Sequence, residues 1–278
     1  MLKNYITIAL RNLWKNKIFS FINIAGLSIG LACAMLIILY TKDELSYDRF
    51  HKNNPNIYRI VNRWYNPDGS LKHGDGNTGD IQGPSFVSKI PEMQSCLRIQ
   101  SGSTEIRNGT DIQTYDQLIV DSNFFNVFSF PLLSGDPGTS LQAPKSIVIS
   151  EVMAKKFFNS IDVVGKTLEV KDNDLFASYR ITGVSRKCPQ NSSLKFDFLV
   201  KKTVSAADMQ NTENWFNFFQ NSFVVLVPGA DIKSVESKMK QVYQTEAKAA
   251  EEKMLKDYGV NETAAYFLQP LTDRKSVV

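Results

Sequence analysis

The stretch IFSFINIAGLSIGLACAMLIILYT, from Ile18 to Thr41, decides the architecture of this chain. Its 24 residues carry no formal charge, and Lys17 and Lys42 border it. At about 1.5 Å of rise per residue, a helix of this length reaches roughly 36 Å, more than the ~30 Å hydrocarbon layer of a bilayer. A helix satisfies its own backbone hydrogen bonds and can therefore cross lipid alone. The stretch predicts a transmembrane helix over residues 18–41.

Two other interpretations of this stretch stay open. A cleaved signal peptide would use the A-x-A-like triplet Ala32-Cys33-Ala34, and a lipoprotein would be acylated at Cys33. The apolar run exceeds the about 7–15 residues of a signal-peptide core, and its basic lead is long. A lipoprotein would carry a large aliphatic residue three positions before the cysteine, where this chain has Gly30. We therefore favour the uncleaved helix.

Charge around the span predicts its orientation. Four basic and no acidic residues precede it, whereas the charges directly after it nearly cancel. Basic flanks favour the cytoplasmic side, so we expect the N-terminus inside and residues 42–278 outside. The chain holds 32 Lys and Arg against 28 Asp and Glu, and without residues 1–17 the two counts are equal. The net charge of +4 is thus a feature of the membrane flank, and no nucleic-acid partner is expected.

A pair of glycines predicts helix packing inside the span. Gly26 and Gly30 form a small-xxx-small pattern, which lets another helix approach closely. The general abundance of glycine in membrane helices explains the pair equally well.

The lead, residues 1–17, is expected to form an amphipathic helix. Its apolar side carries Leu10, Leu13 and Trp14, and basic residues lie between them. Such a helix lies along the inner leaflet in contact with membrane lipid. We predict a coupling helix on which a cytoplasmic partner presses, and a passive interfacial anchor is the alternative.

The rest of the chain predicts an α+β protein: one N-terminal transmembrane helix, then a two-part mixed α/β extracytoplasmic domain with a β-rich middle subdomain. Residues 42–116 and 217–278 are assigned to an α/β (porter-like) subdomain, and residues 117–216 to the β-rich insertion. The membrane helix is expected to continue outward by two or three turns within residues 43–53, before Asn54 and Pro55 break it.

Local patterns place further elements. Asn108-Gly109 is a hairpin signal, and Ser150 is placed to cap a helix that buries residues 152, 153 and 157. The four phenylalanines of residues 124–130 are expected in the core. Expected strands include 57–61, 92–100, 104–107, 117–121, 167–170, 179–184, 196–200, 222–227 and 264–268, and expected helices are 84–90, 151–159 and a single one over 231–258.

Few residues suggest chemistry. His51 and His73 stand in separate polar segments without zinc-ligand spacing. An oxidising periplasm would permit a disulfide between Cys96 and Cys188, but the sequence does not show that they approach. Residues 160–167 end like a phosphate-binding loop, yet a helix precedes them and a strand follows, the reverse of what that loop needs. We expect no metal, no cofactor and no enzymatic activity.

Several segments together resemble a known family. ALRNLWKNKIFSFINIAGLSIGLA and ELSYDRFHKNNPNIYRI, followed in order by DSNFFNVFSF, LLSGD, IVISE, VGKT, TGV, PQNSS and FDF, are similar to MacB/FtsX-like ABC transporter permeases. The resemblance covers nearly the whole chain. It implies an N-terminal helix in a bacterial inner membrane and a MacB-like core domain in the periplasm, in a complex for export or mechanotransmission.

The resemblance also implies partners. These are a cytoplasmic ABC ATPase subunit, a second permease in a homo- or heterodimer, and a periplasmic adaptor. Family members return to the membrane after the periplasmic domain, whereas this sequence stops at FLQPLTDRKSVV, so we expect a truncated product or a fragment. The alternative function is a single-span, membrane-anchored periplasmic binding or sensor module without transport.

Overall fold

The computed structural model describes residues 2–172 and 174–273, and the chain divides after Tyr47 into two units. The first unit holds helices α1 (Leu2–Lys15) and α2 (Lys17–Ser46). Among the described residues, α2 is the one helix whose length and composition suit a membrane span, and none of it is buried within the protein. The predicted membrane helix and its amphipathic lead therefore both form as helices.

The outward extension of α2 is shorter than predicted. The helix ends at Ser46, one turn after the apolar stretch, and does not continue toward Asn53. Asp48 has a φ of +56°, a left-handed backbone that cannot continue a right-handed helix. The polar turns that follow therefore begin at Tyr47, and the prediction of two or three additional turns is wrong.

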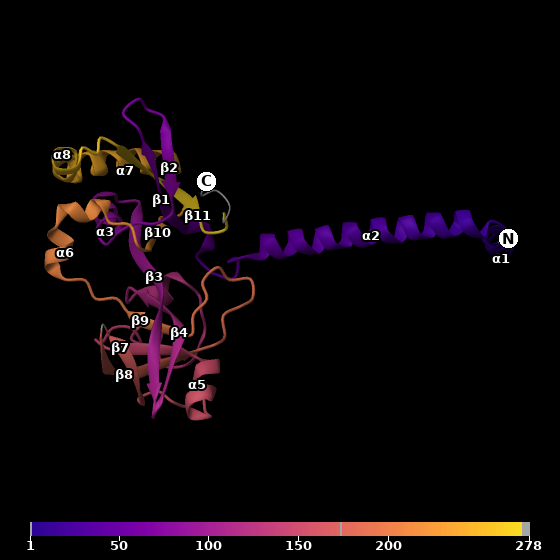
Figure 1. Cartoon of the computed structure of the whole chain (residues 1–278), viewed down its shortest axis with the longest axis horizontal. Helices are drawn as coiled ribbons and strands as arrows, with labels where there is room; N and C mark the ends of the chain where they lie inside the picture. Colours follow the sequence, from indigo (N-terminus) through magenta and orange to yellow (C-terminus); the bar gives the residue numbers. More distant parts are fainter. Residues whose placement is uncertain (1, 173, 274–278) are drawn as a thin grey trace. The chain divides into compact units, whose positions relative to one another are not determined.

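The second unit is built on one sheet of 11 strands, drawn in Figure 1. Its order is β11-β1-β10-β3-β4-β9-β6-β8-β5, while β2 pairs with β1, and β7 pairs with β3 and β8. Most neighbours are antiparallel, and β4–β9 and β6–β8 are parallel. The strands are β1 (Ile57–Tyr65), β2 (Leu71–Asp75), β3 (Met93–Asn108), β4 (Asp111–Val120), β5 (Leu132–Ser134), β6 (Ser146–Ser150), β7 (Thr167–Asp172), β8 (Leu175–Ser185), β9 (Phe198–Lys201), β10 (Asn221–Leu226) and β11 (Thr263–Pro270).

Short helices lie around this sheet. In Figure 1, α3, α7 and α8 gather near β1 and β11, whereas α5 lies at the other end of the domain, near β8. The helices are α3 (Gln82–Lys89), α4 (Phe124–Val127), α5 (Glu151–Phe158), α6 (Ala206–Gln210), α7 (Ile232–Glu246) and α8 (Lys248–Tyr258), with 3-10 turns η1 (Asn54–Asn56) and η2 (Thr212–Phe216). The expected fold class, a β-rich mixed α/β domain after one apolar helix, is confirmed.

Strand β3 runs through the whole domain. Its 16 residues join the two strands predicted at 92–100 and 104–107. The join contains three small residues, Ser101, Gly102 and Ser103, which are exposed, so the alternation of buried and exposed positions is interrupted there without a break in the strand. The predicted hairpin at Asn108-Gly109 is confirmed, because Asn108 pairs with Asp111.

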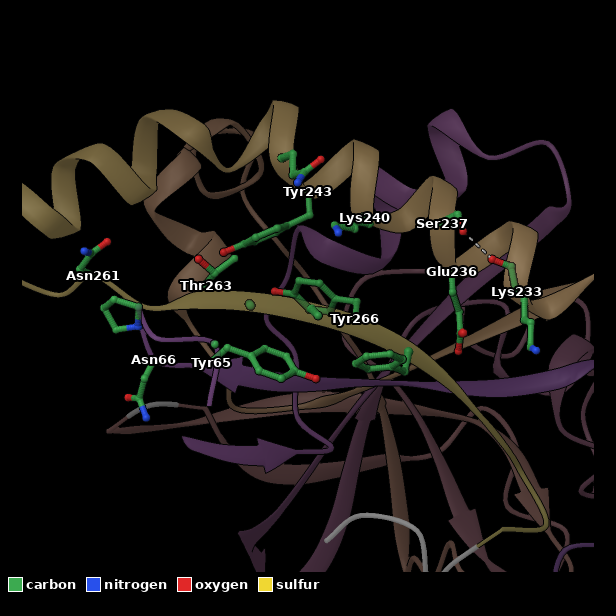
Figure 2. A pocket seen from close by; sticks show the side chains of 16 residues that line it. Tyr65, Asn66, Lys233, Glu236, Ser237, Lys240, Tyr243, Asn261, Thr263 and Tyr266 are labelled. Carbon is green, nitrogen blue, oxygen red and sulfur yellow. Dashed lines mark hydrogen bonds between the residues drawn. The ribbon is translucent and has the colours of Figure 1, made fainter. Parts of the chain in front are cut away.

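Three hydrophobic clusters form the core. The first lies between the β1, β10 and β11 end of the sheet and helices α3 and α7; Figure 2 shows Tyr243 of α7 and Tyr266 of β11 between these elements, with ring centroids 5.3 Å apart. The second gathers the phenylalanines of residues 124–130, as expected, and the third joins α5 to β6, β8 and β9. The predicted division into subdomains 42–116 with 217–278 and 117–216 stays a prediction.

Two details of the helices differ from the predictions. The single helix expected over 231–258 is two helices, separated at Ala247, which is fully buried. Helix α7 buries Val235, Met239 and Tyr243, whereas α8 buries only Ala250.

Helix α5 begins as predicted. The Ser150 side chain accepts a hydrogen bond from the backbone N–H of Met153, which is buried. Val152 was expected to be buried as well, but 43% of its surface is exposed. It directly follows the first helical residue, and the face that α5 turns to the sheet carries Met153 and Ala154 instead.

Candidate functional site

Asp48, the first residue of the second unit, is held by hydrogen bonds to a distant loop of that unit. The backbone N–H of Asp48 donates to the carbonyl of Asn191 at 3.0 Å, and its carboxylate Oδ1 accepts from the N–H of Ser193 at 2.8 Å and from the Ser192 hydroxyl at 3.5 Å. Asp48 is 1% exposed. We call residues 48–54, with the loops that hold them, the Asp48 clamp.

His51 fixes the same segment to a second loop. Its Nδ1 accepts a hydrogen bond from the backbone N–H of Ser129 at 3.0 Å, so the neutral ring carries its proton on Nε2. The ring is enclosed by Phe50, Phe128 and Phe130, with centroids 4.0, 4.8 and 5.2 Å away. Burial lowers the pKa of His51 to about 4, against the opposing charge of Asp48. The histidine is thus a neutral hydrogen-bond acceptor near pH 7.

Further polar contacts complete the clamp. The backbone N–H of Lys52 donates to the Ser129 hydroxyl at 2.9 Å, and the Asn54 amide donates to the carbonyl of Asp48 at 3.0 Å. Residues 48–54 are therefore held by two loops that are distant in sequence, 126–130 and 189–193. Moving this segment requires breaking bonds to both.

Two buried atoms of the clamp have unused hydrogen-bonding capacity. Within the described part of the chain, Asp48 Oδ2 and His51 Nε2 have no hydrogen-bond partner. A buried polar atom without a partner costs about 1–3 kcal/mol. The clamp is therefore held less tightly than its number of contacts alone indicates.

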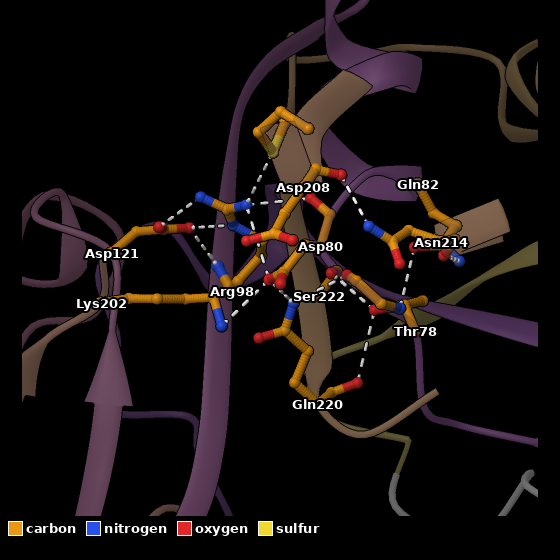
Figure 3. A network of polar contacts seen from close by, with 12 residues as sticks. Thr78, Asp80, Gln82, Arg98, Asp121, Lys202, Asp208, Asn214, Gln220 and Ser222 are labelled. Atoms are coloured by element: carbon orange, nitrogen blue, oxygen red, sulfur yellow. Dashed lines mark hydrogen bonds and ion pairs between the residues drawn. The ribbon is translucent and has the colours of Figure 1, made fainter. Parts of the chain in front are cut away.

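A second polar network surrounds Arg98 and is shown in Figure 3. Arg98 of β3 binds both carboxylate oxygens of Asp121, by contacts of 2.8 and 2.9 Å, and donates to the carbonyl of Asp80. Lys202 and Gln220 reach the Asp80 carboxylate at 3.0 and 2.8 Å. The charges of Arg98 and Lys202 therefore balance those of Asp80 and Asp121.

This balance assigns the network a structural role. Burial acts to lower the pKa of Arg98, but the hydrogen bonds and charges of Asp121 and Asp80 raise it by more. The guanidinium stays charged and ties β3 to Asp80 and to Asp121, which directly follows β4. Arg98, Lys202, Asp80 and Asp121 each have an ion-pair partner within the network.

The predicted site residues all belong to the first unit. Gly26 and Gly30 are exposed, and a Cβ added at either would meet nothing within 4 Å. Leu10, Leu13 and Trp14 of α1 are exposed as well. The predicted roles of these positions in helix packing and in coupling stay predictions.

The clamp residues were not selected from the sequence. Asp48 and His51 stand in ELSYDRFHKNNPNIYRI, a segment that carries the family resemblance, but there they looked like polar residues of a helix end. Their partners lie more than 75 residues further along the chain. The resemblance itself was the one signal that could have pointed to them.

The described residues offer little for catalysis or metal binding. No group of three or more His, Cys, Asp or Glu side chains among them could hold a metal ion. Cys96 and Cys188 are free thiols that pack in different hydrophobic clusters, the first and the second. The disulfide considered from the sequence is therefore absent. Burial raises the pKa of Cys96 to about 12, so its thiol is unreactive.

Comparison with known families identifies the class of the chain. Residues 20–242 match the family model of the MacB-like periplasmic core domain, and the chain belongs to this family. The family belongs to ABC-type permease-like transporters. No curated protein matches the chain significantly.

Solved structures share the fold. A domain assigned to a permease of Porphyromonas gingivalis is 21% identical, with a TM-score of 0.66 over 79% of this chain and 91% of that one. The periplasmic region of MacB from Actinobacillus actinomycetemcomitans is 15% identical, with a TM-score of 0.45 over 78% and 90%. The extracellular domain of the ABC-type transporter YknZ from Gram-positive bacteria is 15% identical, with a TM-score of 0.43 over 75% and 99%.

Proposed function

We propose that this chain is the N-terminal part of a permease subunit that couples a cytoplasmic ABC ATPase to a periplasmic domain, for export or mechanotransmission. The N-terminus lies in the cytoplasm, α2 crosses the inner membrane, and residues 48–273 work in the periplasm. The family match supports the class of protein, and the basic lead supports the orientation.

The Asp48 clamp is the observation that carries this proposal. A helix transmits force to a domain only if the chain that follows it is fixed, because a flexible linker absorbs the displacement. Here a single residue, Tyr47, separates the end of α2 from Asp48, whose backbone and side chain are both held. Two loops of the domain receive the displacement, 126–130 through His51 and 189–193 through Asp48.

The first unit carries the positions at which we expect the ATPase and a second permease to bind. The exposed apolar face of α1 offers Leu10, Leu13 and Trp14 to the ATPase. The open face at Gly26 and Gly30 offers a close-packing site to a second permease. A periplasmic adaptor completes the complex outside the membrane.

Affinity purification tests the coupling. The tagged full chain, expressed in its native host and extracted in mild detergent, is expected to retain an ABC ATPase subunit. The double variant L10D/W14D places two charges on the apolar face of α1 and is expected to lose the ATPase while remaining in the membrane fraction. The matched control N4D/N12D adds the same charge to the polar side of α1 and is expected to retain it.

The outcomes separate the two candidate functions. Retention of the ATPase by L10D/W14D would contradict the role of α1 as the coupling helix. If the unchanged chain retains a periplasmic protein but no ATPase, the single-span binding or sensor module is the correct function and the permease is not.

A further inference from the structure

Basic side chains gather where α1 meets α2. Arg11 and Lys15 are four residues apart, and therefore on one side of α1, and Lys17 is the first residue of α2. All three are exposed. Within residues 2–172 and 174–273, none of them forms an ion pair. We call these three residues the basic junction.

No acidic residue of the first unit is close enough to neutralise the basic junction. Residues 1–42 contain no Asp or Glu, so the first acidic residue of the chain is Asp43. Asp43 lies near the other end of α2, about 39 Å from Lys17 at 1.5 Å of rise per residue. Salt at physiological strength screens exposed charges over about 8 Å. The counter-charges of the basic junction therefore come from the surroundings of the first unit.

Trp14 indicates where these charges lie relative to a bilayer. Tryptophan is enriched at the boundary between membrane and water, because its ring is apolar and its N–H is polar. Trp14 is 73% exposed, and the Lys17 ammonium lies 5.5 Å from the centroid of its ring. Arg11 and Lys15 are within one helical turn of Trp14 along α1. The basic junction thus belongs at the level of the lipid headgroups.

The backbone bends at this level. Asn16, between the two helices, has a φ of −113° and a ψ of 55°, whereas a helix continues at about −63° and −42°. The axis of α1 therefore departs from the axis of α2 directly before the apolar stretch begins. This bend allows α1 to follow the membrane surface while α2 crosses the bilayer.

The apolar side of α1 also fits a lipid leaflet. Leu10 and Leu13 are exposed within the first unit, on the side of α1 away from Arg11 and Lys15, and none of α2 is buried. The basic junction is thus continuous with apolar surface that a bilayer would cover, and its own charge complements a negative headgroup. We propose that the basic junction binds anionic phospholipid headgroups in preference to zwitterionic ones, an inference that rests on the proposed position of α2 across the membrane.

Native mass spectrometry of the full chain in lipid nanodiscs tests this proposal. The nanodiscs contain phosphatidylcholine and phosphatidylglycerol in a ratio of four to one, and the lipids that stay bound to the released chain are identified by mass. A basic residue close to the surface favours an anionic lipid by about fivefold. We therefore expect the ratio of phosphatidylglycerol to phosphatidylcholine among the bound lipids to be about fivefold that of the bilayer.

Two variants of the basic junction separate charge from side-chain shape. R11Q/K15Q removes two charges and is expected to bring the bound ratio close to that of the bilayer. R11K/K15R exchanges the two cations and is expected to keep the enrichment. Both variants leave Leu10 and Trp14 unchanged, so neither result depends on the proposed contact with an ATPase.

A matched variant controls for net charge. K42Q/R49Q removes two exposed charges beyond the other end of the apolar stretch, where Asp43 and Glu44 directly follow Lys42, and is expected to keep the enrichment. Enrichment that survives R11Q/K15Q, or that both glutamine variants reduce equally, would overturn the proposal, and so would a bound ratio equal to that of the bilayer. A chain that does not enter the nanodiscs at all would instead contradict the membrane span and the proposed function with it.

Discussion

Asp48 is the residue whose loss should loosen the clamp most. Its carboxylate accepts the Ser193 N–H at 2.8 Å, and a hydrogen bond to a charged group contributes about 1.5–3 kcal/mol. Alanine removes this acceptor and is itself disfavoured at a φ of +56°, by roughly 1–2 kcal/mol. The variant D48A should therefore lower the free energy of opening the clamp by about 3 kcal/mol.

Two further substitutions separate the causes. D48G loses the carboxylate but tolerates the left-handed backbone, so it should cost about 2 kcal/mol. D48N keeps a neutral acceptor and also tolerates that backbone, so it should cost about 1 kcal/mol. The order of destabilisation is therefore alanine, glycine, asparagine.

Amide hydrogen exchange on the full chain in detergent measures the opening directly. The amides to follow are those of Ser129 and Ser193, which donate to the two sides of the clamp. Since about 1.4 kcal/mol is a factor of ten, exchange should accelerate about 100-fold in D48A, 30-fold in D48G and fivefold in D48N.

A control variant defines the background. Asp68 also accepts a backbone N–H, at 2.9 Å, but in an exposed turn, and D68A should leave both amides unchanged. Equal exchange in all three Asp48 variants, or acceleration spread over the whole sheet, would refute the idea that this residue holds a local clamp.

Three other properties follow from the structure and are measured by denaturant unfolding of the full chain in detergent, followed by tryptophan fluorescence. The pKa of His51 is about 4 in the folded chain against 6.5 in the unfolded one, so the stability that the neutral ring contributes is fully present above pH 6.5 and is lost as the pH falls toward 4. The free energy of unfolding should drop by up to about 3 kcal/mol across this range, and by much less in H51N. R98M leaves two mostly buried carboxylates facing one lysine and should lower the free energy of unfolding by about 3–5 kcal/mol. K89A, at an exposed ion pair, should lower it by under about 1 kcal/mol. Similar losses in the two variants would contradict a structural role of the Arg98 network. A Cβ at Gly83 would lie 2.4 Å from the Cys96 sulfur, so G83A should cost about 1–3 kcal/mol. G102A, with nothing within 4 Å of the added Cβ, should be neutral, and an equal effect of both variants would show that α3 shifts freely.

Local patterns predicted the elements that depend on neighbouring residues. The apolar stretch, the hairpin at Asn108-Gly109 and the cap at Ser150 are each set within a few positions of the chain, and each is found. The helix over 231–258 looked continuous because strong helix formers fill it. The break at Ala247 lies between Glu246 and Lys248, both strong helix formers, so no residue type in the segment marks it.

The candidate site could not be predicted in the same way. The clamp joins Asp48 and His51 to loops that follow some 80 to 145 residues later, and no periodicity links such positions. The left-handed backbone at Asp48 likewise depends on its tertiary partners.

Topology tests the central claim most directly, namely that α2 separates a cytoplasmic lead from a periplasmic domain. A recognition site for a specific protease is inserted at Gly109, in the exposed turn between β3 and β4, and protease is added to intact spheroplasts. We expect cleavage of the intact spheroplast sample to the same extent as after membrane disruption. Cleavage only after disruption would place the domain inside the cell and contradict the proposed path of force.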